Sequence, residues 1–119
     1  MYFSSYKDFF GALANETRLS ILTVLRDKKA CVSDICNETD LEQSRISHNL
    51  RILATWSFVD YEISGKERIY FISDEAKPFL ASLDDYLEKY GEKLRTCEII
   101  SGKKTCRLMS ENEKENNKN

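Results

Sequence analysis

The sequence predicts a mainly α-helical fold with one β-hairpin, and three observations lead to this class. Only one proline and four glycines interrupt the 119 residues, which favours long helices. Apolar residues recur at intervals of three and four over most of the chain, as in helices with one buried face. Between residues 58 and 72 the period changes to two, which indicates a pair of strands.

Two helices are expected first, separated by a residue that can cap the second. The apolar stripe of the first helix is Phe9, Phe10, Leu13 and Ala14. Asn15 is a preferred N-cap, because its side chain can accept a bond from an unpaired backbone N–H. The apolar positions of the second helix are Leu19, Ile21, Leu22 and Leu25. They predict a buried helix that runs to about Asp27.

Two shorter helices joined by a tight turn follow. Ser33 is the expected N-cap of the third helix, with Asp34 in its first turn and an end near Thr39. The fourth helix is expected from about Gln43 to Thr55. Its apolar stripe is Ile46, Leu50 and Leu53, and its other face is polar.

A hairpin and a long last helix complete the chain. In the first strand Val59, Tyr61 and Ile63 alternate with polar residues, Ser64-Gly65 forms a turn, and residues 68–72 return. Asp74 and Pro78 mark the entry to the last helix. A long apolar stripe on this helix favours packing against an identical chain. Its dimerisation candidates are Phe79, Leu83, Leu87, Tyr90 and Leu94.

Two short helices followed by a hairpin predict a winged helix-turn-helix, whose second helix enters the major groove of duplex DNA. The side chains expected to reach base edges are Gln43, Ser44, Ser47 and His48. Those expected mainly on phosphates are Arg45, Arg51, Lys66 and Arg68. Because the net charge of the chain is −2, any basic surface must be local.

The domain organisation is predicted from composition. Residues 1–96 form the DNA-binding and dimerisation domain, residues 97–106 are bounded by two cysteines, and residues 107–119 are a polar tail expected to be disordered. The chain has no apolar stretch of about 20 residues and no secretory signal, so we expect a cytoplasmic protein. It has no phosphate-binding glycine loop and no recognisable catalytic pair, which argues against an enzyme.

Four stretches together resemble the ArsR/SmtB-type winged-helix repressors, over about residues 8–95. The stretches are Ala12 to Leu22, Cys31 to Cys36, Glu42 to Leu53 and Gly65 to Tyr70. They are similar, in that order, to the entry to the family's second helix, its metalloid-binding segment, its recognition helix and its wing. The resemblance implies a dimeric DNA-binding repressor that a metal, metalloid or thiol signal releases.

The cysteines depart from the pattern of the arsenic-sensing members, which carry Cys-Val-Cys-Asp-Leu-Cys in the third-helix segment. Here the outer two cysteines are Cys31 and Cys36, and the middle position is Ser33. Cys36 is expected near the start of the helix, where the helix dipole favours a thiolate, and its sulfur could meet that of Cys31. Two thiolates need one or two further ligands to hold a soft cation, and Cys97 and Cys106 are the candidates.

Two further departures concern the zinc sensors and the turn after the recognition helix. Zinc-sensing members use histidines and carboxylates on the last helix, but the only histidine here is His48 on the recognition helix. The carboxylates of Asp84, Asp85 and Glu88 alone would be a poor zinc site. The family has a glycine after the recognition helix where this chain has Ser57, which suggests a different turn.

Three readings of the signal stay open. The first is a soft metal or metalloid ion bound by thiolates, with no obligatory cofactor. The second is a thiol-redox switch in which Cys31 and Cys36, or Cys97 and Cys106, form a disulfide. In the third, the winged helix binds a protein and no DNA, and the cysteines are structural. In the first two readings the partners are operator DNA and a second copy of the chain, with no membrane.

Overall fold

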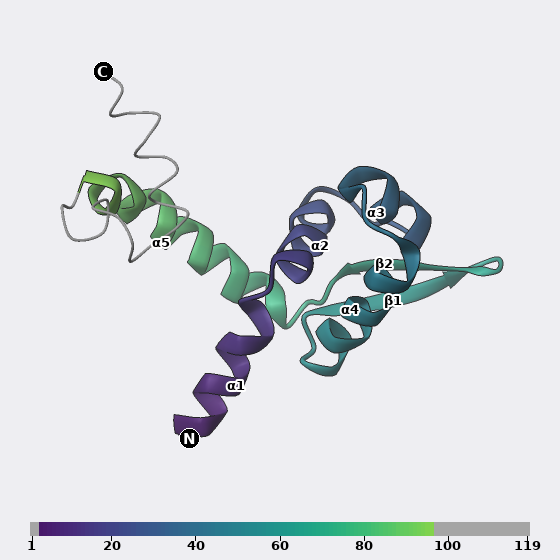
Figure 1. Ribbon diagram of the computed structural model, residues 1–119, viewed down its shortest axis with the longest axis horizontal. Coiled ribbons are helices and arrows are strands. Elements are labelled where there is room, and N and C mark those ends of the chain that lie inside the picture. Colours follow the sequence, from purple (N-terminus) through teal and green to yellow (C-terminus); the bar gives the residue numbers. More distant parts are fainter. Residues whose placement is uncertain (1–2, 97–119) are drawn as a thin grey trace. The chain divides into compact units, whose positions relative to one another are not determined.

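The computed structural model describes the backbone of residues 3–96 and the side chains of residues 5–91. Within this range the helices and strands are α1 (Phe3–Leu13), α2 (Glu16–Asp27), α3 (Val32–Thr39), α4 (Gln43–Thr55), β1 (Val59–Ser64), β2 (Glu67–Ile72) and α5 (Ala76–Thr96) (Figure 1). The chain divides into two compact units, residues 1–78 and residues 79–119. The predicted mainly helical class with a two-stranded hairpin is confirmed.

Local signals set most helix ends. The Asn15 side chain accepts a bond from the Arg18 N–H at 3.0 Å, so Asn15 caps α2 as predicted. Helix α2 ends at Asp27, α3 ends at Thr39, and α4 has both of its predicted ends. Because the caps and the apolar spacing lie within a few residues of each helix end, they could be found in the sequence.

The start of α3 differs from the prediction. Cys31 is the N-cap residue and makes no side-chain capping bond, and Ser33 lies within the helix. The reason is a long-range contact, because Ala30 pairs with Tyr70 of β2 through both of its backbone groups, at 3.0 and 2.8 Å. The chain leaves this pairing at Ala30 and enters the helix directly, and the Ile35 N–H donates to the Cys31 carbonyl.

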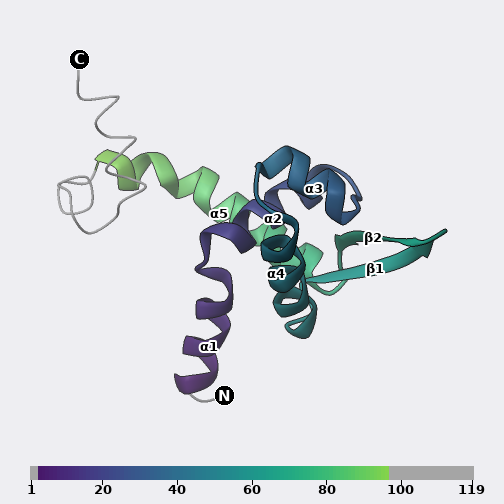
Figure 2. The ribbon, with the colours of Figure 1, turned by 45° about the vertical axis from the view of Figure 1, so that its right-hand side comes forward.

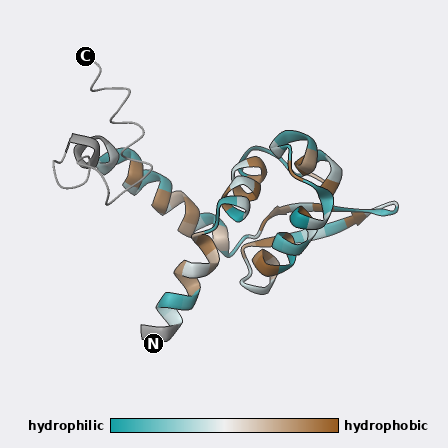
Figure 3. Ribbon diagram, in the orientation of Figure 1, coloured by the Kyte–Doolittle hydropathy of each residue, from teal (hydrophilic) through white to brown (hydrophobic). Residues whose placement is uncertain are grey.

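Helices α2, α3 and α4 pack together beside the hairpin, as the two ribbon views show (Figure 2). The largest fully buried side chains are Ile21, Leu22, Ile35, Ile46, Leu50 and Leu53. Hydropathy colours alternate around these helices, so each has an apolar and a polar face (Figure 3). Leu19 was predicted to be buried but is 49% exposed, because it lies off the face that Ile21, Leu22 and Leu25 form.

The hairpin pairs its strands antiparallel from Val59 opposite Ile72 to Ser64 opposite Glu67, and Gly65 turns the chain with a φ of 65°. The alternation over these residues predicted a strand, which is confirmed, and within β1 only Val59 is buried while Ile63 is 65% exposed. The hairpin extends beyond the helices, so its outer half has no core to cover it (Figure 1). This places the hairpin tip at the surface.

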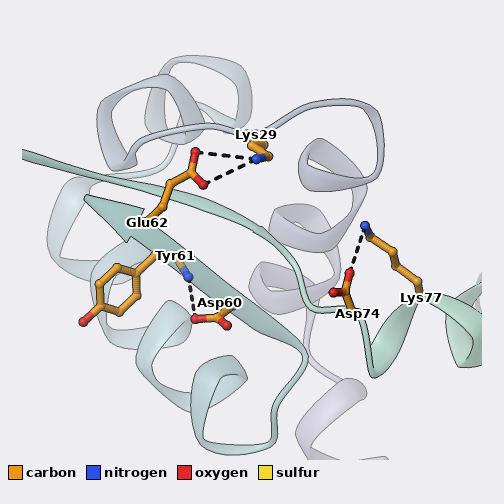
Figure 4. A network of polar contacts seen from close by, with 6 residues as sticks. All are labelled: Lys29, Asp60, Tyr61, Glu62, Asp74 and Lys77. Atoms are coloured by element: carbon orange, nitrogen blue, oxygen red, sulfur yellow. Dashed lines mark hydrogen bonds and ion pairs between the residues drawn. The ribbon is translucent and has the colours of Figure 1, made fainter. Parts of the chain in front are cut away.

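Helix α5 starts after Ser73, which accepts the Ala76 N–H at its side-chain oxygen at 3.1 Å. The carboxylate of Asp74, just before the helix, lies 3.3 Å from the ammonium of Lys77 in the first turn (Figure 4). No helix in the described part of the chain is long and apolar enough to cross a membrane.

Candidate nucleic-acid interface

Helix α4 presents one polar arc to its surroundings. The residues predicted to reach DNA on this helix, apart from Arg45, are Gln43, Ser44, Ser47, His48 and Arg51. At 100° per residue they span about 140° of the helix circumference. All of them are exposed or half-buried, whereas Ile46, Asn49, Leu50 and Leu53 are buried. The helix therefore anchors one side in the core and leaves its predicted DNA-reading side uncovered.

A groove of about 790 Å³ separates α4 from the hairpin. Five of the predicted DNA-binding residues line it, namely Gln43, Ser47, Arg51, Lys66 and Arg68. Ser44, Arg45 and His48 are not among its lining residues, although all three are exposed. The hairpin thus brings two cations, Lys66 and Arg68, to the same groove as the polar side chains of α4.

Two tyrosines that the sequence reasoning missed hold Arg68 in place. The guanidinium carbon of Arg68 lies 4.5 Å from the centroid of the Tyr61 ring, and the rings of Tyr61 and Tyr70 are 5.5 Å apart. A hydrogen bond with the Tyr70 side chain, helped by the charge interaction with Tyr61, raises the pKa of Arg68 above its ordinary value. Counting residues outward from the turn at Gly65 places Tyr61 opposite Tyr70, so this pair could have been identified from the sequence.

The opposite face of β1 carries the anchor of the hairpin. The Lys29 ammonium lies 3.5 Å from both carboxylate oxygens of Glu62 and 4.9 Å from the centroid of the Phe71 ring. Figure 4 shows that Glu62 and Tyr61 leave the strand on opposite sides, as neighbours on a strand do. Glu62 is therefore directed away from the groove, while Glu67 is the one carboxylate among the lining residues.

Arg45 has a partner within the protein. Its Nε donates to the Thr17 hydroxyl oxygen on α2 at 2.9 Å. The sequence predicted only a phosphate contact for this residue. The buried Asn49 beside it was missed, although a polar residue among the apolar positions of α4 was visible in the sequence.

The two cysteines within the described range are free thiols and do not assemble a metal site there. Cys31 is 7% exposed, lines the groove, and has its sulfur 3.2 Å from the Ser33 hydroxyl oxygen. Cys36 is half-buried, and five helical positions from Cys31 correspond to about 140° around the helix axis. No group of three or more candidate metal ligands occurs among the described residues.

The expected position of Cys36 near the start of its helix is wrong. Cys36 is the fifth residue of α3, and its carbonyl accepts the Asp40 N–H at the C-terminal end. It therefore lies outside the first turn, to which the effect of the helix dipole on a thiolate is confined. Cys97 and Cys106 lie outside the described residues.

The dimerisation candidates that can be placed lie on one side of α5. Leu87 is 54% exposed, and Tyr90 and its neighbour Tyr86 are also exposed, with their rings 4.7 Å apart. Phe79 and Leu83 are half-buried. Leu94 belongs to α5, but its side chain is outside the described range.

Comparison with known proteins identifies the family. Residues 15–61 match the family model described as "Bacterial regulatory protein, arsR family". The arsenical resistance operon repressor of Bacillus subtilis is 34% identical over 71 residues, which are 59% of this chain and 68% of that protein. The chain belongs to the ArsR family.

Other relatives of this ArsR-family chain agree in sequence and fold. The transcriptional repressor SmtB homolog of Synechocystis is 34% identical over 67 residues, 56% of this chain and 51% of that protein. The chain thus spans about half the length of this relative. The solution structure of the homodimeric winged helix-turn-helix DNA-binding domain of a possible ArsR-family regulator from Mycobacterium bovis is also similar. It has a TM-score of 0.61 and 28% identity, over 70% of this chain and 77% of that one. These relatives are transcriptional regulators and not enzymes, and the winged helix-turn-helix fold is confirmed.

Proposed function

We propose that this ArsR-family chain is a homodimeric transcriptional repressor that binds operator DNA through α4 and the hairpin. We further propose that a soft metal or metalloid ion bound by cysteine thiolates releases it. The observation that carries the DNA-binding part is the groove between α4 and the hairpin, which gathers Gln43, Ser47, Arg51, Lys66 and Arg68.

The chemistry of the groove suits duplex DNA. Gln43 and Ser47 can exchange hydrogen bonds with base edges in the major groove. Arg51, Lys66 and Arg68, which line the same groove, supply positive charge for phosphates. Because the chain as a whole is acidic, this local group of cations directs DNA to one surface.

The exposed apolar side chains of α5 support a second copy of the chain as partner. Tyr86, Leu87 and Tyr90 leave large apolar surface uncovered within the described part of α5. The M. bovis domain is homodimeric, and a dimer presents two recognition helices to two half-sites of an operator. A repressor acts where the chromosome is, so we place this protein in the cytoplasm.

The DNA-binding part is tested by selection from a random-sequence duplex pool. The wild-type protein should enrich a pseudo-palindromic sequence, because two identical subunits read two half-sites. Its affinity for the selected duplex, measured by fluorescence anisotropy, should exceed that for a scrambled duplex by about 10³-fold or more. Failure to enrich any sequence at low salt would refute operator binding and favour a protein-interaction module.

The release signal is proposed from the thiols. Cys31 lines the groove beside the recognition helix, and the B. subtilis relative is an arsenical resistance operon repressor. A complete soft-ion site needs ligands beyond Cys31 and Cys36, for which Cys97 and Cys106 are available in the sequence. A thiol titration under reducing conditions, with and without arsenite or cadmium, tests this. Protection of thiols by the ion supports it, and thiol loss only on mild oxidation would indicate a redox switch.

A further inference from the structure

A group of hydrogen-bonded polar side chains, two of them buried, joins α2 to the recognition helix α4. The Arg18 guanidinium donates twice, from Nε to the Ala12 carbonyl oxygen at 2.6 Å and from Nη1 to the Asn49 side-chain oxygen at 2.8 Å. The Asn49 amide in turn donates to the Arg45 carbonyl oxygen at 2.9 Å. Arg45 completes the circuit by donating from Nε to the Thr17 hydroxyl oxygen at 2.9 Å. We call these four side chains, Thr17, Arg18, Arg45 and Asn49, the polar clamp.

The polar clamp is buried where it crosses between the helices. Asn49 is 7% exposed and Thr17 is 4% exposed, so water cannot readily replace a lost partner. Within the described residues, no buried side-chain nitrogen or oxygen lacks a hydrogen-bond partner. A satisfied buried network of this kind specifies one geometry, because a shifted helix would leave its members unpaired.

The position of the clamp on α4 determines what it can control. Arg45 and Asn49 are one helical turn apart, and their mean direction lies about 180° around the helix axis from the mean direction of Gln43, Ser47 and Arg51. A rotation of α4 about its axis would therefore break the clamp and swing the groove-lining side chains away together. Apolar contacts on the same helix allow small rotations more easily, since dispersion forces are not directional.

We propose that Asn49 is a positioning residue, which with Arg18, Arg45 and Thr17 holds the rotation of α4 at which its polar arc reads base edges. This inference rests on the proposed DNA binding. It assigns sequence selectivity to residues that face away from the groove and that do not touch the bases. The clamp also includes the carbonyl of Ala12 in the last turn of α1, so a single arginine side chain links three helices.

The test compares two affinities for each variant by fluorescence anisotropy at one fixed salt concentration. One probe is the duplex that the wild-type protein selects from a random pool, and the other is a scrambled duplex of the same composition. In Asn49→Ala the ratio of the two affinities should fall about tenfold, the discrimination that one good base contact supplies. Affinity for the scrambled duplex should change less than about twofold, because phosphate contacts carry it.

Matched variants keep the result interpretable. Thr17→Val removes one hydroxyl and keeps the side-chain volume, so it should fold even where Asn49→Ala does not, and should lower the ratio about threefold. Thr23→Val makes the same change at an exposed position of α2, and Asn37→Ala removes an exposed amide from α3. Both controls should leave the ratio within about twofold of wild type.

The outcomes separate the two proposals. A lower ratio in Thr17→Val or Asn49→Ala, with the controls unchanged, supports the clamp as a positioning device. If both affinities fall by the same factor and the melting temperature falls too, the clamp only stabilises the fold and the inference is overturned. A wild-type protein that selects no sequence overturns the proposed function itself.

Discussion

At the scale of single residues, Ser57 shows that surrounding contacts can hold a non-glycine residue in a left-handed backbone conformation. It follows the end of α4 and has a φ of 63°, in the left-handed region that favours glycine. Its N–H donates to the Ala54 carbonyl, and its own carbonyl accepts the Ser73 hydroxyl. The serine suggested a different turn from the glycine of the resembling family, but it adopts the glycine-type conformation. Contacts on both sides of the residue hold it there.

Ser57→Gly should therefore stabilise the fold. Glycine adopts the left-handed conformation without steric strain, and this gain in free energy is larger than the cost of the extra conformational entropy that glycine gives the unfolded chain. The free energy of unfolding should therefore rise by roughly 0.5–1 kcal/mol. Urea denaturation followed by circular dichroism measures this change. Ser64→Gly, in the extended backbone of β1, is the control and should destabilise the protein. A loss of stability in Ser57→Gly would contradict the argument.

The proposed response to a metal or metalloid ion also depends on single residues, namely the four cysteines. If Cys97 and Cys106 supply the sensing thiols, replacing both with serine should abolish release from DNA by arsenite or cadmium and leave DNA affinity unchanged. The measurement is anisotropy of the DNA complex as each ion is titrated. An unchanged response would move the sensor to Cys31 and Cys36, and their double replacement should then make the protein unresponsive.

At the scale of elements, contacts with the loop between α2 and α3 hold the hairpin, and its tip is left exposed to solvent. The pairing of Ala30 with Tyr70 and the Lys29–Glu62 ion pair both hold it to the loop between α2 and α3. Lys66 and Arg68 lie beyond these anchors, on the side of the groove. This arrangement suits cations that touch phosphates without reading a sequence.

Lys66→Ala or Arg68→Ala should weaken binding about equally for selected and scrambled duplexes. Each should also make the slope of log affinity against log salt less steep by about one. Anisotropy titrations at several salt concentrations measure both effects. Lys77→Ala removes the same charge from the start of α5, outside the groove, and should leave the slope unchanged. A loss confined to the selected duplex would contradict this role.

Ser47→Ala and His48→Ala should act differently from the hairpin variants. Both residues lie on the polar arc of α4, so their loss should change which base pairs are preferred at one or two positions of each half-site. Repeating the selection with each variant shows the change. If these variants only weaken binding uniformly, the assignment of base contacts to α4 is wrong.

At the scale of the whole molecule, assembly determines whether two recognition helices act together. In the proposed dimer, the exposed side chains of Leu87 and Tyr90 on α5 would contact the partner, while the opposite side of the helix carries small and charged residues such as Ala81. Burial of a leucine in a dimer contributes roughly 1.5–3 kcal/mol. A charge placed in the stripe removes this gain and adds the cost of desolvation.

Leu87→Glu should accordingly yield a monomer, and Leu83→Glu should do the same. Operator affinity should fall by at least about 100-fold, because a single recognition helix reads only one half-site. Ala81→Glu adds the same charge on the opposite side of α5 and should stay dimeric. Sedimentation equilibrium gives the masses, and a wild-type monomer that binds the selected duplex tightly would refute the prediction.

The elements that could be predicted from the amino-acid sequence are those whose signals are local. The Asn15 cap, the end of α3 at Thr39, both ends of α4 and the turn at Gly65 each depend on a few neighbouring residues. The same stretches were sufficient to indicate the family. Such features are encoded by backbone preferences and by spacing, which act over one or two turns of chain.

Which side chains lie together could not be predicted from the sequence, because it depends on long-range packing. The start of α3 depends on Ala30 meeting Tyr70, and the exposure of Ile63 depends on how far the hairpin reaches past the helices. The bond between Arg18 and Asn49 joins residues 31 positions apart, and that between Arg45 and Thr17 spans 28. No local preference specifies such pairs. They form because packing the apolar faces of α2 and α4 buries polar groups that must then find partners.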